Sequence, residues 1–338
     1  MPLGTLVDQC FKQSSLNATD EVRYAHASIY SVLSVFGSVL NVLLLAIIGI
    51  EWKRLSDSKF YCLVVCLCCS SLVYLLPNFI LMIPCTAFAC DFYSDTVMSL
   101  SASLNTVGYY TSLFATFGIT TERFLLFFAK DIHFFFSRHV WKAAIVAWLG
   151  GLGVMAFTVV VGCFKRFNRY TFQYTFFCSE CNDEGTTLSE GLFILGQVLP
   201  GIMLASYAVI FGKVLVNRRR TSLSSYADDC RLALQFTLIC TFQWFSAFFF
   251  YMVPRVFGTT HYGVMATNVC GILNTAVNPT VLFLFNSRIR HGFKKGLRFM
   301  RTGTSVSSLR HSGVTHTHPP RVTAATTLPH SVSTNVGH

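Results

Sequence analysis

Residues 60–82 read FYCLVVCLCCSSLVYLLPNFILM and contain no Lys, Arg, Asp or Glu. A helix of about 20 mostly apolar residues is long enough to cross the hydrocarbon of a bilayer, so this stretch predicts a membrane-spanning helix. The whole chain is 53% hydrophobic and only 12% charged, whereas soluble domains carry about 25% charged residues. Six further stretches are similar, with charges only near their edges: 27–50, 97–121, 140–163, 191–214, 232–253 and 263–285. We therefore predict an all-α integral membrane protein built as a seven-transmembrane helix bundle.

The distribution of basic residues predicts the orientation of the bundle. If the N-terminus lies outside, 20 of the 26 Lys and Arg residues fall in cytoplasmic segments, and cytoplasmic loops normally carry such an excess. Asn17-Ala18-Thr19 is a glycosylation sequon, which is usable only in an extracytoplasmic segment. The first 25 residues lack the pattern of a cleaved signal peptide. We expect a multi-pass protein of the cell membrane with Asn17 glycosylated, the N-terminus extracellular and the C-terminus cytoplasmic.

Four segments follow from this topology. Residues 1–26 are expected to be extracellular, and residues 27–285 form the bundle. Residues 286–301 predict a short amphipathic eighth helix on the membrane surface, because Ile289, Phe293 and Leu297 share one face and basic residues the other. Residues 302–338 are rich in Ser, Thr, His and Pro and are expected to be disordered. Phosphorylation there would suit an arrestin-like partner; an unregulated linker is the alternative.

Six of the seven spans contain landmark residues at plausible depths. They are Asn41 in the first span, Glu122-Arg123-Phe124 at the end of the third, Trp148 in the fourth, Pro200 in the fifth, Trp244 in the sixth and NTAVNP at 274–279 in the seventh. With these landmarks, residues 28–300 resemble the rhodopsin-like (class A) family of G-protein-coupled receptors.

The sequence differs from the family's pattern at several positions. Phe124 and Leu282 stand where the family has tyrosines, Ser246 stands where it has a proline, and Cys69-Ser70-Ser71 replaces an acid of the second span. Tyr207 lies one residue nearer Pro200 than the family's tyrosine. In this divergence and in its many phenylalanines, the chain is most similar to the chemosensory serpentine receptors of nematodes.

The resemblance implies a receptor that binds a ligand and activates a heterotrimeric G protein. The switch would involve Glu122, Arg123, Asn278 and Pro279. Two acids at the start of the sixth helix, Asp228 and Asp229, would pair with Arg123 in the closed state. The alternatives are that Arg123 only extends toward lipid phosphates and that the two aspartates are solvated acids favoured by the helix dipole.

The resemblance also places a ligand pocket between the helices near their outer ends. The candidate residues are Asn105, Tyr109, Trp244, Phe248 and Asn268. No carboxylate lies well inside the spans, so a cationic amine would lack a counter-ion, and we expect a small, neutral and partly apolar ligand. Helix packing is the alternative role for each residue.

A disulfide between the top of the third helix and the second outer loop is a further implication of the resemblance. We expect a Cys90–Cys178 bond, with Cys85–Cys181 as a second candidate. Other pairings and free thiols remain open from sequence alone.

Other classes of protein have less support in the sequence. No cluster has metal-ligand spacing and no glycine-rich phosphate loop is present, so we expect no enzymatic activity, metal site, cofactor or nucleic-acid partner. A transporter or a ligand-gated channel subunit is the alternative. Transporters usually contain internal repeats and intramembrane charges, and neither is evident here.

Overall fold

The computed structural model describes residues 3–13, 15–16, 18–55, 60–88, 90, 93–176, 178, 186–217, 223–257 and 260–294. Asn17, Cys181 and the predicted tail 302–338 therefore lie outside the described residues. The described chain is mostly helical. Its helices are α1 (Leu3–Gln13), α2 (Asp20–Ile50), α3 (Trp52–Leu55), α4 (Phe60–Pro77), the π-helix η1 (Asn78–Met82), α5 (Ile83–Phe88), α6 (Asp95–Phe128), α7 (Lys130–Arg138), α8 (Val140–Val160), α10 (Thr186–Asn217), α11 (Leu223–Phe257) and α12 (His261–Phe285).

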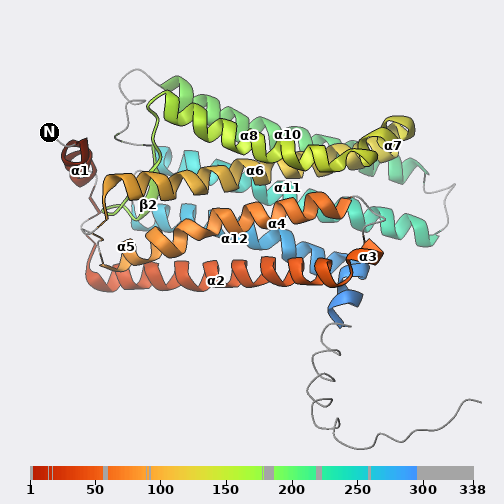
Figure 1. The fold of residues 1–338 in the computed structure, drawn as a ribbon, viewed down its shortest axis with the longest axis horizontal. Helices are drawn as coiled ribbons and strands as arrows, with labels where there is room; N and C mark the ends of the chain where they lie inside the picture. The colour runs from red at the N-terminus through yellow and green to blue at the C-terminus, as the bar shows by residue number, and fades with distance from the viewer. Residues whose placement is uncertain are drawn as a thin grey trace, which may run out of the picture. The chain divides into compact units, whose positions relative to one another are not determined.

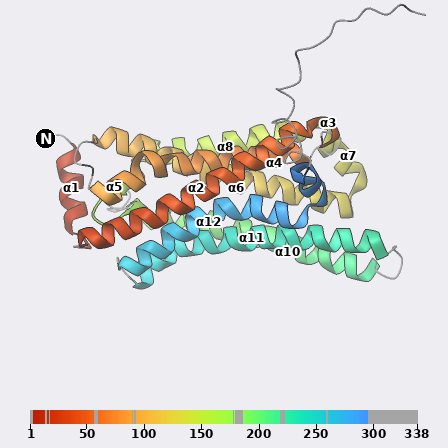
Figure 2. The same ribbon diagram turned by 90° about the horizontal axis from the view of Figure 1, so that it is seen from below.

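The long helices lie side by side with nearly aligned axes, and successive helices such as α2 and α4 run in opposite directions (Figures 1 and 2). One end, here called the hairpin end, carries α1, α5 and a two-stranded hairpin. The other end, here called the α7 end, carries α3 and α7. The hairpin pairs β1 (Arg166–Asn168) with β2 (Gln173–Thr175) in antiparallel register, with Phe167 opposite Tyr174. It lies in the connection between α8 and α10.

Six helical segments of the described chain are long and apolar enough to cross a membrane. They are Asp20–Ile50, Phe60–Phe88, Val140–Val160, Glu190–Val216, Leu234–Val253 and His261–Phe285. The third predicted span is not among them. It corresponds to α6, which has 34 residues but is interrupted by many Ser, Thr and Asn side chains that lower its hydropathy. The six segments indicate an all-α membrane protein.

The outer faces of these helices are apolar. On α8, Val146 is 65% exposed, Leu149 is 61% exposed and Val160 is 83% exposed. A continuous apolar surface of this kind is unfavourable in water and marks a surface that another apolar phase covers. Lipid is the phase that fits helices of this length.

Two glycines allow α6 to pack closely against its neighbours. α6 contacts α4, α8, α10 and α11. A Cβ atom on Gly108 would lie 2.7 Å from Tyr74 Cα and 2.8 Å from Ser70 O in α4. A Cβ atom on Gly151 of α8 would lie 2.9 Å from Val107 O in α6. Because real Cβ atoms do not approach backbone so closely, both positions require glycine.

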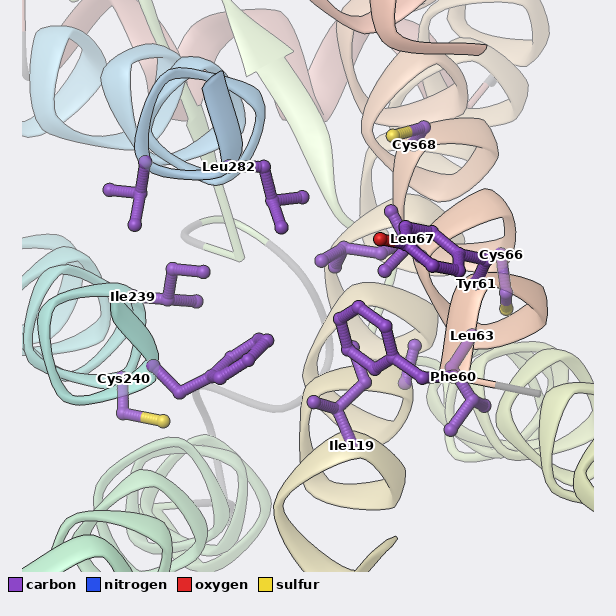
Figure 3. Packing of buried hydrophobic residues seen from close by; sticks show 14 of the residues in the cluster. Phe60, Tyr61, Leu63, Cys66, Leu67, Cys68, Ile119, Ile239, Cys240 and Leu282 are labelled. Carbon is purple, nitrogen blue, oxygen red and sulfur yellow. The ribbon is translucent and has the colours of Figure 1, made fainter. Parts of the chain in front are cut away.

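A hydrophobic core fills the bundle toward the α7 end (Figure 3). Phe60 and Leu63 of α4 lie there with Ile119 of α6, Ile239 of α11 and Leu282 of α12, and all five are almost fully buried. Because lipid tails are as apolar as these side chains, close van der Waals packing rather than removal from water stabilises this core. The core therefore joins α4 and α6 to α11 and α12.

The helix boundaries differ from the predicted spans mainly at the ends. α2 begins at Asp20, seven residues before the predicted span, and α11 continues past Pro254 to Phe257. Residues 287–294 are helical, which covers the first half of the predicted eighth helix. Asn286 Oδ1 accepts hydrogen bonds from the backbone N–H groups of Arg288 (3.0 Å) and Ile289 (3.3 Å), as an N-cap does. Ile289 is fully buried.

Candidate functional site

The hairpin is tethered to two helices by ion pairs. Arg166 donates through Nε and Nη2 to the Asp95 carboxylate in the first turn of α6, at 3.0 and 3.2 Å. Arg169 Nη2 donates to Asp8 Oδ1 of α1 at 2.7 Å. Partial burial acts to raise the pKa of Asp8, but the hydrogen bond and charge of Arg169, together with hydrogen bonds from Tyr170 and Lys12, outweigh it, so the pKa of Asp8 lies below its ordinary value. The hairpin is thus held to both α1 and α6.

Two disulfides stabilise the same end of the bundle. Cys10 is bonded to Cys178 and Cys85 to Cys90, with Cα atoms 6.0 and 4.6 Å apart. The predicted Cys90–Cys178 and Cys85–Cys181 bonds are therefore wrong. Cys90 adopts a left-handed φ of 47°, and the turn brings it within bonding distance of Cys85. α1 brings Cys10 to the loop, a partner that the receptor resemblance does not contain. Cys163 is also disulfide-bonded.

A cavity opens between the helices at the hairpin end. It is a small cavity, in which the centres of water-sized molecules can occupy about 50 Å³. Four helices and the segment that contains the hairpin supply the lining. The lining residues are Tyr74 of α4; Asn105, Thr106, Tyr109 and Tyr110 of α6; Lys165, Tyr174 and Phe176 of the α8–α10 connection; Ser246, Ala247, Phe250 and Tyr251 of α11; and Thr267, Asn268 and Gly271 of α12.

Three of the five predicted ligand residues line this cavity, namely Asn105, Tyr109 and Asn268. Asn268 Nδ2 also donates to the Tyr30 hydroxyl at 3.0 Å and to the carbonyl of Phe172 at 2.8 Å. Its amide therefore connects α12 to α2 and to the hairpin turn.

The structure does not bring the other two predicted residues, Trp244 and Phe248, into the cavity. Their rings stack on each other with centroids 5.7 Å apart, and Phe248 is 38% exposed. The helical phase of α11 instead presents Ser246, Ala247, Phe250 and Tyr251 to the cavity. The prediction placed each residue by its distance along the helix, as the receptor family implies. That distance does not determine which side of the helix faces the cavity.

Lys165 is the charged residue of the described cavity lining, and the sequence analysis did not identify it. Its Nζ donates to Asn105 Oδ1 at 2.6 Å and lies 5.0, 5.6 and 5.9 Å from the ring centroids of Phe250, Tyr174 and Phe176. No carboxylate of the described residues lies within 4.0 Å of this ammonium. Burial lowers the pKa of Lys165 to about 7, because removing a lone ammonium from water disfavours its charged form.

Two tyrosine hydroxyls of the cavity have no hydrogen-bond partner among the described residues. They belong to Tyr109 of α6 and Tyr174 of β2, and both are buried. Buried polar groups in native proteins nearly always have a partner. Both hydroxyls are therefore available to a bound molecule.

A signal for the role of this connection is present in the sequence. Aromatic residues recur at short intervals from 164 to 176, as Phe164, Phe167, Tyr170, Phe172, Tyr174 and Phe176. A solvated loop has no need of such a series, so it indicates a loop packed into the bundle. A lysine inside that series then becomes a candidate for burial.

The predicted switch residues form a small cluster at the α7 end. Arg123 Nε lies 3.2 Å from Glu122 Oε2, although the geometry does not meet hydrogen-bond criteria. The Arg123 guanidinium also lies 4.3 Å from the ring centroid of Phe60. Glu122 Oε1 contacts His133 Nε2 of α7 at 3.1 Å. Arg123 is thus held by a carboxylate and an aromatic ring.

The remaining predicted switch residues lie on α11 and α12. Asn278 and Pro279 are buried in α12. Asp228 and Asp229 belong to α11 by their backbone, but their side chains lie outside the described residues, and so does their predicted pairing with Arg123.

The comparisons with known proteins identify a family but no activity. No protein with a curated description matches the chain. A family model described as "Protein of unknown function (DUF621)" matches residues 15–301, which is most of the chain. The chain therefore belongs to the DUF621 family.

Proposed function

We propose that this protein is a divergent, chemosensory seven-helix receptor that activates a heterotrimeric G protein. α6 would be the third of the seven spans, with the N-terminus outside the cell. A small, partly apolar ligand would bind in the cavity at the hairpin end. The observation that carries the proposal is that one helix, α6, contributes Asn105 and Tyr109 to the cavity and Glu122 and Arg123 to the cluster at the opposite end.

The side chains of α6 suit a helix buried among other helices. Thr116 Oγ1 donates to Ser112 O at 2.8 Å, and Thr120 Oγ1 donates to Thr116 O at 2.9 Å. Such bonds satisfy hydroxyls within the helix itself. The acids and the arginine of α6, Asp95, Glu122 and Arg123, lie toward its two ends and have partners. The low hydropathy of α6 is therefore compatible with a span that other helices shield from lipid.

The cavity is placed where a ligand would influence the relative positions of α6, α11 and α12. A ligand shifts the balance between two arrangements only if it binds one of them more tightly. An outward displacement of α11 would uncover Arg123 and the adjoining core at the α7 end. A G protein would bind there, and the predicted Ser- and Thr-rich tail would supply phosphorylation sites for an arrestin-like partner.

Nucleotide exchange on a purified heterotrimeric G protein tests this function. The full-length receptor in lipid nanodiscs is screened with a library of small odorants, and stimulated exchange is measured. Arg123→Ala should abolish stimulated exchange while ligand binding persists. Arg138→Ala, an exposed arginine of α7, should leave exchange unchanged.

Three outcomes would contradict the proposal. Full stimulation in Arg123→Ala would exclude the proposed coupling residue. Ligand uptake or ion current in G-protein-free vesicles would favour a transporter or a channel. Epitope tags at both termini of the chain that are accessible from the same side of the membrane would exclude an odd number of spans.

A further inference from the structure

Three basic residues in or beside the hairpin, Lys165, Arg166 and Arg169, have different electrostatic partners. Arg166 is paired with Asp95, and Arg169 is paired with Asp8. Lys165 has no acidic partner among the described residues, although it extends into the cavity. The Lys165 side chain is partly buried, and charges that are withdrawn from water are normally paired. Lys165 is therefore a cation whose counter-ion the described chain does not supply.

The surroundings of Lys165 stabilise an ammonium but do not neutralise it. The Asn105 carbonyl oxygen accepts one hydrogen bond from Nζ, which leaves two of the three N–H donors. Three aromatic rings lie within 6 Å, at the distance of weakly attractive cation–π contacts. The unpartnered hydroxyls of Tyr109 and Tyr174 line the same cavity.

We propose that the ligand of this cavity is a small organic carboxylate with an apolar body. The carboxylate pairs with Lys165 Nζ and accepts hydrogen bonds from the hydroxyls of Tyr109 and Tyr174. The apolar body packs against Phe250 and Ala247 of α11. This inference rests on the proposed function, because it names the class of ligand for the same cavity. It replaces the neutral ligand of the sequence analysis, which considered charges within the spans and not in the loop.

The pH dependence of binding has a definite sign. Burial holds the pKa of Lys165 near 7, and a carboxylate binds only the protonated amine. Raising the pH above 7 removes the proton before the ligand arrives, so affinity falls by up to about tenfold per pH unit. Below pH 7, affinity stays constant until the carboxylate itself is protonated near pH 4–5. The other titratable groups of the described cavity lining are phenols, which stay protonated throughout this window: Tyr74, Tyr109, Tyr110, Tyr174 and Tyr251.

Matched acids and amides test the inference without any G protein. Binding of phenylacetate, hexanoate and indole-3-acetate, and of their uncharged amides, is measured by ligand-observed NMR on the full-length receptor in nanodiscs. We expect the acids to bind more tightly than the amides. Lys165→Gln should weaken acid binding roughly 10–100-fold, as expected for the loss of a charged hydrogen bond. Lys165→Arg should retain acid binding and lose its pH dependence, because arginine stays protonated.

Lys12→Gln is the matched control, since it removes one positive charge from the hairpin end at a side chain that is 61% exposed and lies outside the cavity. It should change acid affinity less than about threefold, under 1 kcal/mol. Thermal unfolding of each variant identifies any that fail to fold. If Lys165→Gln does not fold, the pH dependence of acid binding in Lys165→Arg tests the inference instead. Equal binding of acids and amides, unchanged acid binding in Lys165→Gln, or no acid binding in the series would overturn the inference. A receptor that binds the acids but never stimulates a G protein would instead refute only the proposed coupling.

Discussion

The side-chain amide of Asn41 in α2 donates a hydrogen bond of 3.0 Å to the backbone carbonyl of Thr275 in α12. Thr275 lies four residues before Pro279, which has no N–H to offer that carbonyl. A side chain of the first long helix thus replaces the helical hydrogen bond that the proline removes. Asn41 Nδ2 also donates to the carbonyl of Gly37 at 2.8 Å.

Replacing Asn41 should therefore destabilise the contact between α2 and α12. Asn41→Leu leaves the Thr275 carbonyl unpaired, and we expect a loss of about 1–3 kcal/mol of stability. Thermal unfolding in nanodiscs measures the change. Val42→Leu, at an exposed neighbouring position, is the control and should be nearly neutral.

A double-mutant cycle with Pro279→Ala tests the same relationship from the other side. Alanine restores the N–H group, so the Thr275 carbonyl regains a helical partner. Asn41→Leu should then cost less in the Pro279→Ala background than in the native one. Equal costs in both backgrounds would show that the two residues are not coupled.

The disulfide pattern gives a second prediction. Non-reducing peptide mapping should recover one peptide pair that joins Cys10 to Cys178 and another that joins Cys85 to Cys90. Cys10→Ser and Cys178→Ser should lower the unfolding temperature by similar amounts, because each removes the same bond between α1 and the α8–α10 connection. A recovered Cys90–Cys178 pair would contradict the structure.

The close approach of α4 and α6 gives a third prediction. Gly108→Ala forces a Cβ atom against the backbone of α4, and overpacking of this kind costs about 1–3 kcal/mol. Gly153→Ala in α8 meets nothing within 4 Å and should be neutral or slightly stabilising. Thermal unfolding compares the two variants directly. Equal effects would mean that α4 and α6 do not pack as closely as described.

The contact between Glu122 and His133 gives a fourth prediction, which concerns basal signalling. His133→Ala frees Glu122 Oε1 from its 3.1 Å partner and loosens the cluster around Arg123. If this cluster holds the inactive arrangement, basal nucleotide exchange should rise roughly threefold, or about 0.7 kcal/mol. His139→Ala, at the residue that directly follows α7, is the control, since its ring contacts the carbonyl (3.1 Å) and the ring (4.8 Å between centroids) of Phe135 rather than Glu122. Unchanged basal exchange in His133→Ala would count against a restraining role.

Lys165 gives a fifth prediction, on stability against pH in the absence of ligand. Its folded pKa of about 7 lies below the ordinary value of 10.5, so between these values the unfolded chain binds more protons than the folded one. Stability should therefore rise as pH increases from 7 toward 9.5, by at most about 1.4 kcal/mol per unit. Lys165→Met should flatten this rise. If stability depends on pH in Lys165→Met as it does in the native protein, the Lys165 ammonium is not withdrawn from water without a counter-ion.

The amino-acid sequence determined the helical membrane character of the protein on its own. The requirement is local, since about 20 consecutive apolar residues must satisfy their backbone hydrogen bonds within one helix. The apolar stretches accordingly correspond to long helices, and a further helical segment begins at residue 287, next to the predicted start at residue 286. Asn105, Tyr109 and Asn268, which were predicted from their positions along the helices, line the cavity; their role in binding a ligand stays a prediction.

Only the tertiary structure decided the disulfide partners, the cavity-facing side of α11 and the position of Lys165. Each depends on how segments far apart in the chain meet: α1 delivers Cys10 to Cys178, and the tethered hairpin region places Lys165 on Asn105. Trp244 and Phe248 have the expected depth but the wrong rotation about the axis of α11. Depth follows from counting residues along one helix, whereas rotation and loop placement follow from packing among several elements, which a pattern along one segment does not contain.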